Sequence, residues 1–261
     1  MLHYDYYYTI GATHQVCQDY AVKGDTPVPF LVLSDGCSSS ANSEIGARIL
    51  TLATKHLIEN ATNWPWNYST FGQKLINKAW NISEKLQLPT SVLDATVMLA
   101  FLYQNSILVY VYGDGCVLFK DYAGHIGTIE IAFTHNAPYY LTYWNDKERH
   151  DEYAECEPNP LVLIDPLNGL SSPKPYQTPL AFCFSLKKFK TIAIASDGAS
   201  QCINIPQKTK LSLAEVATRF LDIQNVSPEF AENHIKNILN QYAQQGIFPA
   251  DDLSIGIFIE S

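Results

Sequence analysis

Positive charge is scarce in this sequence. The 261 residues include only 17 lysines and arginines against 26 aspartates and glutamates, a formal net charge of −9. Affinity for nucleic acid and for anionic membranes comes mainly from basic side chains that neutralise phosphates. The composition therefore argues against nucleic-acid and membrane partners, and against a metal-dependent nuclease. If the chain handles phosphate, bound metal is the obvious other source of positive charge.

Other absences narrow the class further. None of the six cysteines belongs to a Cys-x-x-Cys pair of the kind found in zinc and redox sites. No apolar run reaches the roughly 20 residues that cross a bilayer, and residues 1–5 lack the basic and apolar regions of a signal peptide. We therefore expect a cytoplasmic protein with reduced, mostly buried thiols.

The remaining composition is that of a globular domain. With 47% hydrophobic and 16% charged residues, the chain can bury a sizeable core. Its 16 tyrosines and 12 phenylalanines favour strands, because flat rings fit a pleated, half-buried surface. We predict a single domain over residues 1–261, without internal repeats.

Several apolar runs are typical of buried strands, and three of them lead into Asp-Gly. The three runs are 30–34, 107–113 and 191–196, and their dipeptides begin at Asp35, Asp114 and Asp197. A fourth run, 253–259, follows Asp251. A further strand within 92–103 is predicted to form a hairpin with the run that begins at residue 107.

Two pairs of helices are predicted between these strands. Apolar residues recur at helical spacing over 43–58 and 71–86. In the second pair, Ser212 begins a capping box, and Ser227-Pro228 is predicted to start a helix that Gly246 ends. Because strand–helix–strand alternation is rare, we predict an α+β protein with two mainly antiparallel sheets and helix pairs outside them.

The segment from about 120 to 190 is predicted to be irregular. It holds seven of the fourteen prolines and an aromatic cluster at Tyr139, Tyr140, Tyr143 and Trp144. Such an insertion is typical of a lid, flap or recognition surface, and equally of a long surface connection. Both interpretations stay open here.

Each Asp-Gly alone predicts a hairpin turn, but three at strand exits indicate more. If the strands at 30, 191 and 253 are neighbours in one sheet, Asp35, Asp197 and Asp251 meet at one edge. Clustered carboxylates repel one another unless a cation lies among them. Their oxygens suit Mg²⁺ or Mn²⁺, and a glycine carbonyl can approach such an ion closely. Two bridged ions would polarise a phosphoryl oxygen and generate hydroxide from a shared water.

An ordered set of motifs resembles the protein phosphatase 2C-like family of metal-dependent protein phosphatases. The motifs are Gln18-Asp19, Ser34-Asp35-Gly36, Gly113-Asp114-Gly115, Ser196-Asp197-Gly198 and Asp251-Asp252-Leu253-Ser254. Gly11-Ala12-Thr13-His14 with Cys17-Gln18-Asp19 is similar to a bacterial branch of that family. The resemblance spans nearly the whole chain and implies a four-layer α-β-β-α sandwich, in agreement with the predicted order of elements.

The resemblance also implies metal ligands. Asp35 would bridge two Mn²⁺ or Mg²⁺ ions, and the Gly36 carbonyl would ligate one of them. Asp197 and Asp251 would complete the second metal site, and Asp114 would help to hold a third, weaker ion. Asp19 would lie behind these ligands and orient metal-bound water. Thr96, at the start of a core strand, matches a motif whose role is structural.

Three positions depart from the common eukaryotic pattern. An arginine that clamps the phosphate is replaced by His14, Glu-Asp by Gln18-Asp19, and Asp-Gly-His by Asp35-Gly36-Cys37. We predict that His14 binds the phosphate as an imidazolium, and the alternative is a capping or packing residue. Gln18 changes a water-mediated metal contact. Cys37 replaces the proposed general acid. Because thiols are poor proton donors to such leaving groups, Cys37 would be a spectator and metal-bound water could serve instead.

The resemblance thus implies an enzyme that hydrolyses phosphoserine and phosphothreonine in proteins with metal-activated water. Its partner would be a phosphorylated protein. The alternative is a pseudophosphatase that binds a partner through the 120–190 segment. The intact Asp35, Asp197 and Asp251 favour the enzyme.

Overall fold

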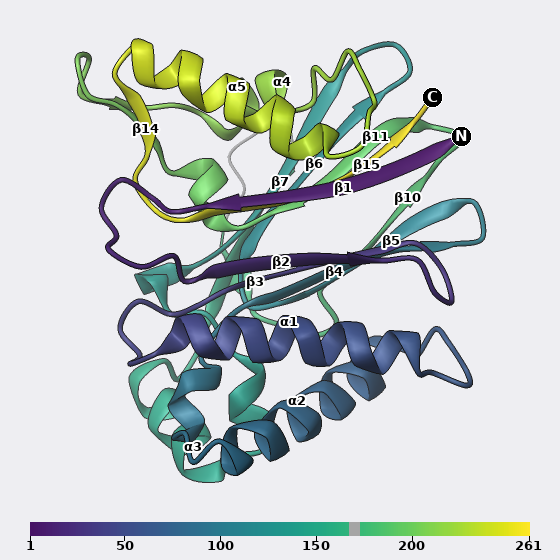
Figure 1. The fold of residues 1–261 in the computed structure, drawn as a ribbon. Helices are drawn as coiled ribbons and strands as arrows, with labels where there is room; N and C mark the ends of the chain where they lie inside the picture. The colour runs from purple at the N-terminus through teal and green to yellow at the C-terminus, as the bar shows by residue number, and fades with distance from the viewer. Residues whose placement is uncertain (167–172) are drawn as a thin grey trace.

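The chain folds into four layers in the computed structural model, which describes residues 1–166 and 173–261 (Figure 1). Two β-sheets stack face to face, and two helices cover the outer face of each (Figure 1). The predicted α-β-β-α sandwich is therefore confirmed. Within the described ranges, the structure contains no helix that is both long and apolar enough to cross a membrane.

The first sheet has seven strands in the order β1-β15-β11-β6-β7-β8-β9. Their bounds are β1 Leu2–Thr9, β15 Leu253–Glu260, β11 Phe189–Ala195, β6 Gly115–Asp121, β7 Ile126–Phe133, β8 Leu161–Pro166 and β9 Lys174–Pro175. All neighbouring pairs are antiparallel.

The second sheet has five antiparallel strands in the order β10-β5-β4-β3-β2. Their bounds are β10 Ala181–Ser185, β5 Ser106–Tyr112, β4 Val97–Tyr103, β3 Phe30–Asp35 and β2 Asp19–Gly24. The predicted hairpin is β4–β5. Three short strands form a small third sheet: β13 Thr209–Lys210, β12 Cys202–Asn204 and β14 Ile247–Pro249.

The helices lie where their apolar faces are buried. Helices α1 (Ser43–Glu59) and α2 (Tyr68–Lys85) pack on the five-stranded sheet, and α4 (Leu213–Phe220) and α5 (Phe230–Gln244) on the seven-stranded sheet. Strand β15 shows the two-residue alternation that separates these layers. Its Ile255 and Ile257 pack under α4 and α5, whereas Phe258 faces the second sheet.

Helix starts were predicted with mixed success. The capping box of Ser212 and Glu215 before α4 is confirmed. The start of the last helix at Ser227-Pro228 is wrong, because Glu229 adopts a left-handed conformation (φ 59°) and α5 begins only at Phe230. The Asp5 carboxylate accepts a hydrogen bond from the Ala231 amide at 3.0 Å. This cap comes from β1, far away in the sequence, where a local pattern cannot reveal it.

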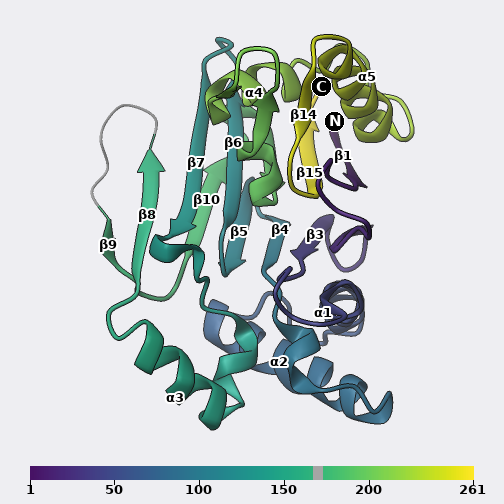
Figure 2. The ribbon, with the colours of Figure 1, turned by 90° about the vertical axis from the view of Figure 1, so that its left-hand side faces the viewer.

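The segment from 120 to 190 is more regular than predicted (Figure 2). Strands β7 to β10 lie in it, together with helix α3 (Lys147–Cys156). The prolines misled the prediction, because proline is tolerated at strand ends and on edge strands. Pro160 directly precedes β8, and β8 and β9 stand at the edge of their sheet. Residues 167–172 of this segment lie outside the described residues.

Candidate functional site

Four aspartates from distant parts of the chain line one cavity of about 290 Å³. We call it the aspartate cavity, and its lining residues are Asp35, Gly36, Cys37, Ser38, Ser39, Thr96, Asp114, His135, Asn136, Pro138, Tyr140, Asp197 and Asp251. All four aspartates that were predicted from the sequence as metal ligands are among them. The structure thus brings these carboxylates together.

The strands that bring the four aspartates together are arranged differently from the prediction. Strand β3, which ends at Asp35, lies in the five-stranded sheet, whereas β11 and β15 lie in the seven-stranded sheet. The expected single sheet edge is therefore wrong, because an apolar run does not reveal which sheet its strand joins. Asp114 stands where the chain crosses from one sheet to the other. Its neighbours Gly113 and Gly115 have φ of 104° and 131°, conformations that favour glycine.

The carboxylates at this site differ in exposure: Asp19 is buried, whereas the Asp251 side chain is 30% exposed. Asp19 lies directly opposite Asp35 in the β2–β3 register. Burial raises the pKa of Asp19 to about 7, although Ser196 donates a hydrogen bond to it at 2.7 Å. Loss of solvent, and then the carboxylates of Asp19 and Asp197, raise the pKa of Asp35 well above its usual range. The pKa values of Asp114 and Asp197 are raised for the same reasons.

The donor set fits divalent cations. Among the described residues that line the cavity, none is a lysine or an arginine. In the described part of the chain, Oδ1 of Asp19 and Oδ1 of Asp197 are buried without a hydrogen-bond partner. Buried oxygens of this kind are costly unless a donor or a cation faces them. Hard carboxylate oxygens with free lone pairs are the ligands that Mg²⁺ and Mn²⁺ prefer.

Backbone contacts fix the position of Asp35. Its amide donates to Oγ1 of Thr96 at 3.2 Å, and the Thr96 amide donates to its carbonyl at 2.8 Å. The structural role expected for Thr96 agrees with these contacts. Gly36 lies so close to α1 that a Cβ atom would come within 2.8 Å of the Ser43 carbonyl carbon. The glycine is thus needed for packing, whatever its carbonyl binds.

A glutamine that the sequence analysis did not single out orients two of the aspartates. Nε2 of Gln201 donates to Oδ2 of Asp197 at 2.6 Å and to Oδ2 of Asp251 at 3.2 Å. Gln201 stands four residues after Asp197, about one helical turn, and this spacing could have suggested a contact.

His14 contacts carboxylates with both ring nitrogens. Nε2 lies 3.3 Å from Asp251 and Nδ1 lies 3.0 Å from the buried Asp252. Partial burial lowers the pKa of His14, but the carboxylates of Asp252 and Asp251 outweigh it, so the net shift is upward. His14 is not among the residues that line the aspartate cavity. This geometry favours the packing alternative over a contact with phosphate.

Asp252 connects this histidine to the N-terminal loop. Its carboxylate accepts hydrogen bonds from the amides of Gly11 at 2.7 Å and Gln18 at 2.6 Å. Among the described residues, His14, Asp251 and Asp252 are the one set of three whose possible metal-binding atoms all lie within 4.8 Å of one another. The predicted ligands line the cavity with wider spacing, which suits two ions better than one.

The other two departures from the family pattern lie near the end of β3, where the Gly36 amide donates to the Gln18 carbonyl at 3.2 Å. Gln18 donates from Nε2 to Oγ of Ser43 at 2.8 Å, which ties the N-terminal loop to α1. Cys37 lines the cavity, and its Sγ lies 3.0 Å from Oγ of Ser39. All six cysteines are free thiols.

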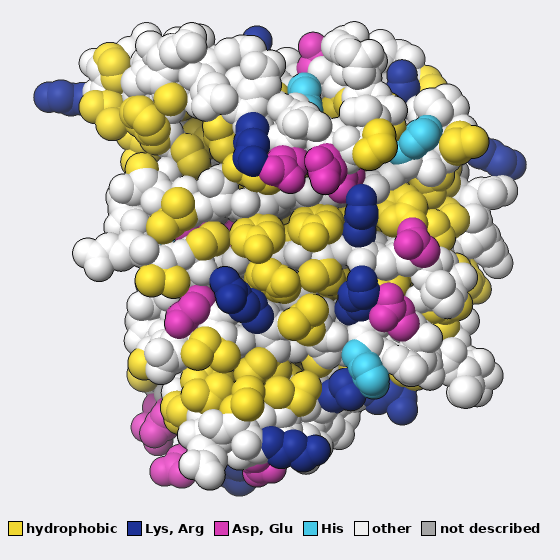
Figure 3. All heavy atoms as spheres, viewed as in Figure 1, with side chains coloured by type: hydrophobic (Ala, Val, Ile, Leu, Met, Phe, Trp, Pro, Cys, Tyr) yellow, Lys and Arg dark blue, Asp and Glu magenta, His cyan; other side chains and the backbone are white. Residues whose placement is uncertain are grey.

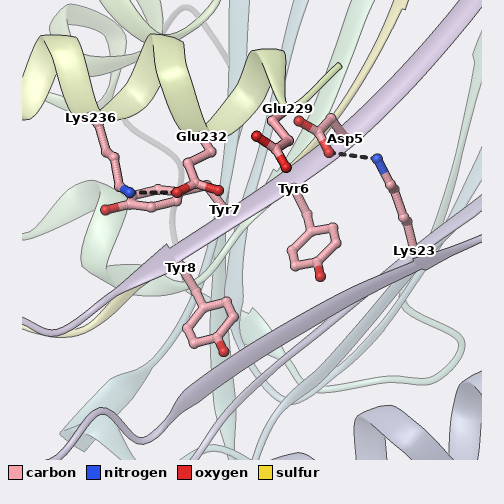
Figure 4. A pocket seen from close by; sticks show the side chains of 8 residues that line it. All are labelled: Asp5, Tyr6, Tyr7, Tyr8, Lys23, Glu229, Glu232 and Lys236. Carbon is pink, nitrogen blue, oxygen red and sulfur yellow. Dashed lines mark hydrogen bonds and ion pairs between the residues drawn. The ribbon is translucent and has the colours of Figure 1, made fainter.

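A larger hollow of about 610 Å³ lies elsewhere, between β1, β2 and α5 (Figure 4). We call it the tyrosine hollow, and its lining residues are Asp5, Tyr6, Tyr7, Tyr8, Lys23, Glu229, Glu232 and Lys236. Lys23 pairs with Asp5 at 2.8 Å, and Lys236 pairs with Glu232. Figure 3 shows basic and acidic side chains side by side on this face, around a band of hydrophobic groups. Two of its three carboxylates, Asp5 and Glu232, thus have lysines of the chain itself as partners.

Comparison with known families identifies the chain. The family model described as protein phosphatase 2C matches residues 11–240. The chain belongs to the protein phosphatase 2C family. The family predicted from the ordered aspartate motifs is therefore confirmed. Sequence comparison with curated proteins gives no match.

Solved structures with the same fold come from bacterial phosphatases. The serine/threonine phosphatase Stp1 from Staphylococcus aureus is 13% identical with a TM-score of 0.61, and 100% of this chain and 96% of that chain are covered. The Mycobacterium tuberculosis phosphatase PstP/Ppp is 15% identical with a TM-score of 0.58, over 99% and 98%. The catalytic domain of PstP in complex with two manganese ions is 14% identical with a TM-score of 0.53, over 99% and 97%.

Proposed function

We propose that this chain is a metal-dependent phosphatase that hydrolyses phosphoserine and phosphothreonine in proteins. One observation carries the proposal: in a member of the protein phosphatase 2C family, four aspartates line one cavity whose lining includes no lysine or arginine. The proposed cofactors are two Mn²⁺ or Mg²⁺ ions and a third, weaker ion. Bound there, the ions would supply the positive charge that a phosphoryl group needs and activate water.

The chain's own residues would have different roles in holding the ions. Asp35, the Gly36 carbonyl, Asp197 and Asp251 would hold the two principal ions, and Asp114 the third. Gln201 keeps two of these carboxylates in place, and Thr96 fixes the backbone of Asp35.

Behind these ligands, Asp19, Gln18 and Cys37 would shape the site. Asp19 faces Asp35 from β2, and its partnerless Oδ1 would accept a hydrogen bond from water. His14 was predicted to bind phosphate. Its contacts give it a different proposed role, which is to tie Asp251 and Asp252 to the N-terminal loop.

The pseudophosphatase alternative is a fold that keeps or loses its metal and binds a partner through the 120–190 segment. All four aspartates are present and converge, so no observation among the described residues favours that alternative. The proposed partner is a phosphorylated protein. The six free thiols suit a reducing compartment, so we propose a cytoplasmic location.

Hydrolysis of two substrates tests the proposal. p-Nitrophenyl phosphate and a phosphothreonine peptide are incubated with the protein in Mn²⁺, in Mg²⁺ and in excess chelator. We expect turnover of both substrates with either ion and none with chelator. Full turnover in chelator would contradict the metal-dependent mechanism, and no turnover with any ion would contradict the enzyme.

A further inference from the structure

His135 is the one histidine among the residues that line the aspartate cavity. It follows β7, in the segment that was predicted to be irregular. Nδ1 of its ring lies 2.9 Å from Oε1 of Glu157, just after α3. The His135 side chain is 76% exposed; its carboxylate partner orients the imidazole and leaves the other nitrogen, Nε2, for a ligand.

The backbone that carries this histidine is unusual. His135 and the next residue, Asn136, both have left-handed conformations, with φ of 63° and 52°. Both line the cavity. Residues other than glycine adopt this conformation at a cost, and such positions cluster at functional sites. Two successive left-handed residues thus form the turn that brings the imidazole to the cavity lining.

The other side chains at the site are poorer candidates than this imidazole for donating a proton to the leaving group. Cys37 stands where related enzymes have a histidine proposed as general acid, and thiols are poor proton donors to an alkoxide leaving group. Burial raises the pKa of Tyr140, the phenol that lines the cavity, so it holds its proton too tightly. His14 has carboxylates beside both ring nitrogens. Imidazole is the side chain that exchanges protons most readily near neutral pH.

We propose that His135 donates the proton to the serine or threonine oxygen that leaves during hydrolysis, a role that rests on the proposed phosphatase function. As the bond between phosphorus and that oxygen breaks, its electron pair goes to the oxygen, which takes the proton from Nε2. The attacking water gives its hydroxyl group to phosphorus, and its other proton returns to the imidazole through solvent. The products are the neutral alcohol and hydrogen phosphate. Glu157 is the positioning residue that holds the ring.

The test uses substrates whose leaving groups need a proton to different degrees. His135→Asn removes the imidazole while keeping a residue that tolerates the left-handed backbone. At saturating Mn²⁺, we expect kcat on a phosphothreonine peptide to fall about 10²-fold. The loss on p-nitrophenyl phosphate should be much smaller, because nitrophenolate leaves without protonation. Across a series of aryl phosphates, kcat of the variant should fall more steeply as the leaving group becomes more basic.

Two further variants distinguish proton donation by His135 from a purely structural role. Glu157→Gln should give a smaller loss, again confined to the peptide. His125→Asn is the matched control, because His125 is also exposed and pairs with a carboxylate, Asp121, at 2.9 Å, but in the β6–β7 turn and outside the cavity lining. It should behave like the wild type on both substrates.

Two results would overturn the assignment. Equal losses of His135→Asn on both substrates would make His135 a structural residue, and an unchanged kcat on the peptide would exclude it as proton donor. In both cases the wild type is active, so the proposed function survives. A wild type that hydrolyses neither substrate would instead overturn the proposed function and this role with it.

Discussion

The aspartate cavity and the tyrosine hollow both contain several carboxylates, but the groups that face them differ. In the tyrosine hollow, Lys23 pairs with Asp5 and Lys236 with Glu232. The lining of the aspartate cavity includes no lysine or arginine, and the pKa of Asp35 is raised by loss of solvent and by its acidic neighbours. Two of the three carboxylates of the larger hollow are therefore paired with lysines of the chain, whereas the smaller cavity needs a cation from outside. In this protein, carboxylates without a basic partner indicate the functional site better than the volume of the cavity does.

The strongest test of this comparison removes one carboxylate from the aspartate cavity and one from the tyrosine hollow. Asp35→Ala should lower turnover of p-nitrophenyl phosphate by several orders of magnitude while the fold survives, because it removes the proposed bridging ligand. Asp5→Ala should keep kcat but lose about 2 kcal/mol of stability, because the Ala231 amide and Lys23 lose their acceptor. Kinetics at saturating Mn²⁺ and thermal unfolding measure both. A folded Asp5→Ala variant as inactive as Asp35→Ala would contradict the distinction.

Metal should stabilise the protein, and more at high pH than at low pH. The pKa of Asp19 is about 7 in the folded state against an ordinary 3.8, and those of Asp35, Asp114 and Asp197 are also raised. Folding then takes up protons between about pH 4 and pH 7, so metal-free stability falls as pH rises through that window. At a hundredfold excess over Kd, Mn²⁺ adds about 2.7 kcal/mol, or about 5–10 °C in Tm.

Thermal unfolding at pH 5 and pH 7.5, with Mn²⁺ and with chelator, measures this effect. The increase in Tm should be larger at pH 7.5, where the carboxylates are ionised. An Asp5→Ala variant should show the same increase. An equal increase at both pH values would contradict the link between the raised pKa values and metal binding.

Asp114 should matter less than Asp35. As a ligand of a weaker third ion, Asp114→Ala should reduce turnover moderately, and its deficit should shrink as the Mn²⁺ concentration rises. Titration of kcat against Mn²⁺ for both variants measures the difference. If Asp114→Ala proved as inactive as Asp35→Ala at saturating Mn²⁺, the proposed ranking of the two sites would be wrong.

Among the predicted site residues, the smallest effect on catalysis is expected at His14. His14→Ala breaks two contacts to carboxylates, so Tm should fall while KM for p-nitrophenyl phosphate changes less than about twofold. The phosphate-binding alternative predicts a different pattern. There, KM should rise in His14→Ala, wild-type KM should rise with pH, and His14→Arg should flatten that dependence because guanidinium stays charged. KM measured from pH 6 to 8.5 at saturating metal separates the two.

Much of the fold was predictable because the information is local. The strand runs at 30, 107 and 191, the helices near 43 and 71, and the capping box at Ser212 all depend on residues within a few positions of one another. The four aspartates were predictable for a related reason, since each follows or precedes an apolar strand in a fixed order along the chain.

The tertiary structure decided which strands share a sheet and which side chains come into contact. No local pattern shows that β3 and β11 lie in different sheets, or that Asp5 caps α5 across 226 residues. The sequence singled out His14 as the notable histidine, yet folding surrounds it with Asp251 and Asp252 and brings His135 to the cavity instead. By itself, the sequence determined which chemical groups are available and how each segment folds locally. Long-range packing decides which of these groups come into contact. It also decides whether a carboxylate lies beside a lysine or faces a cavity.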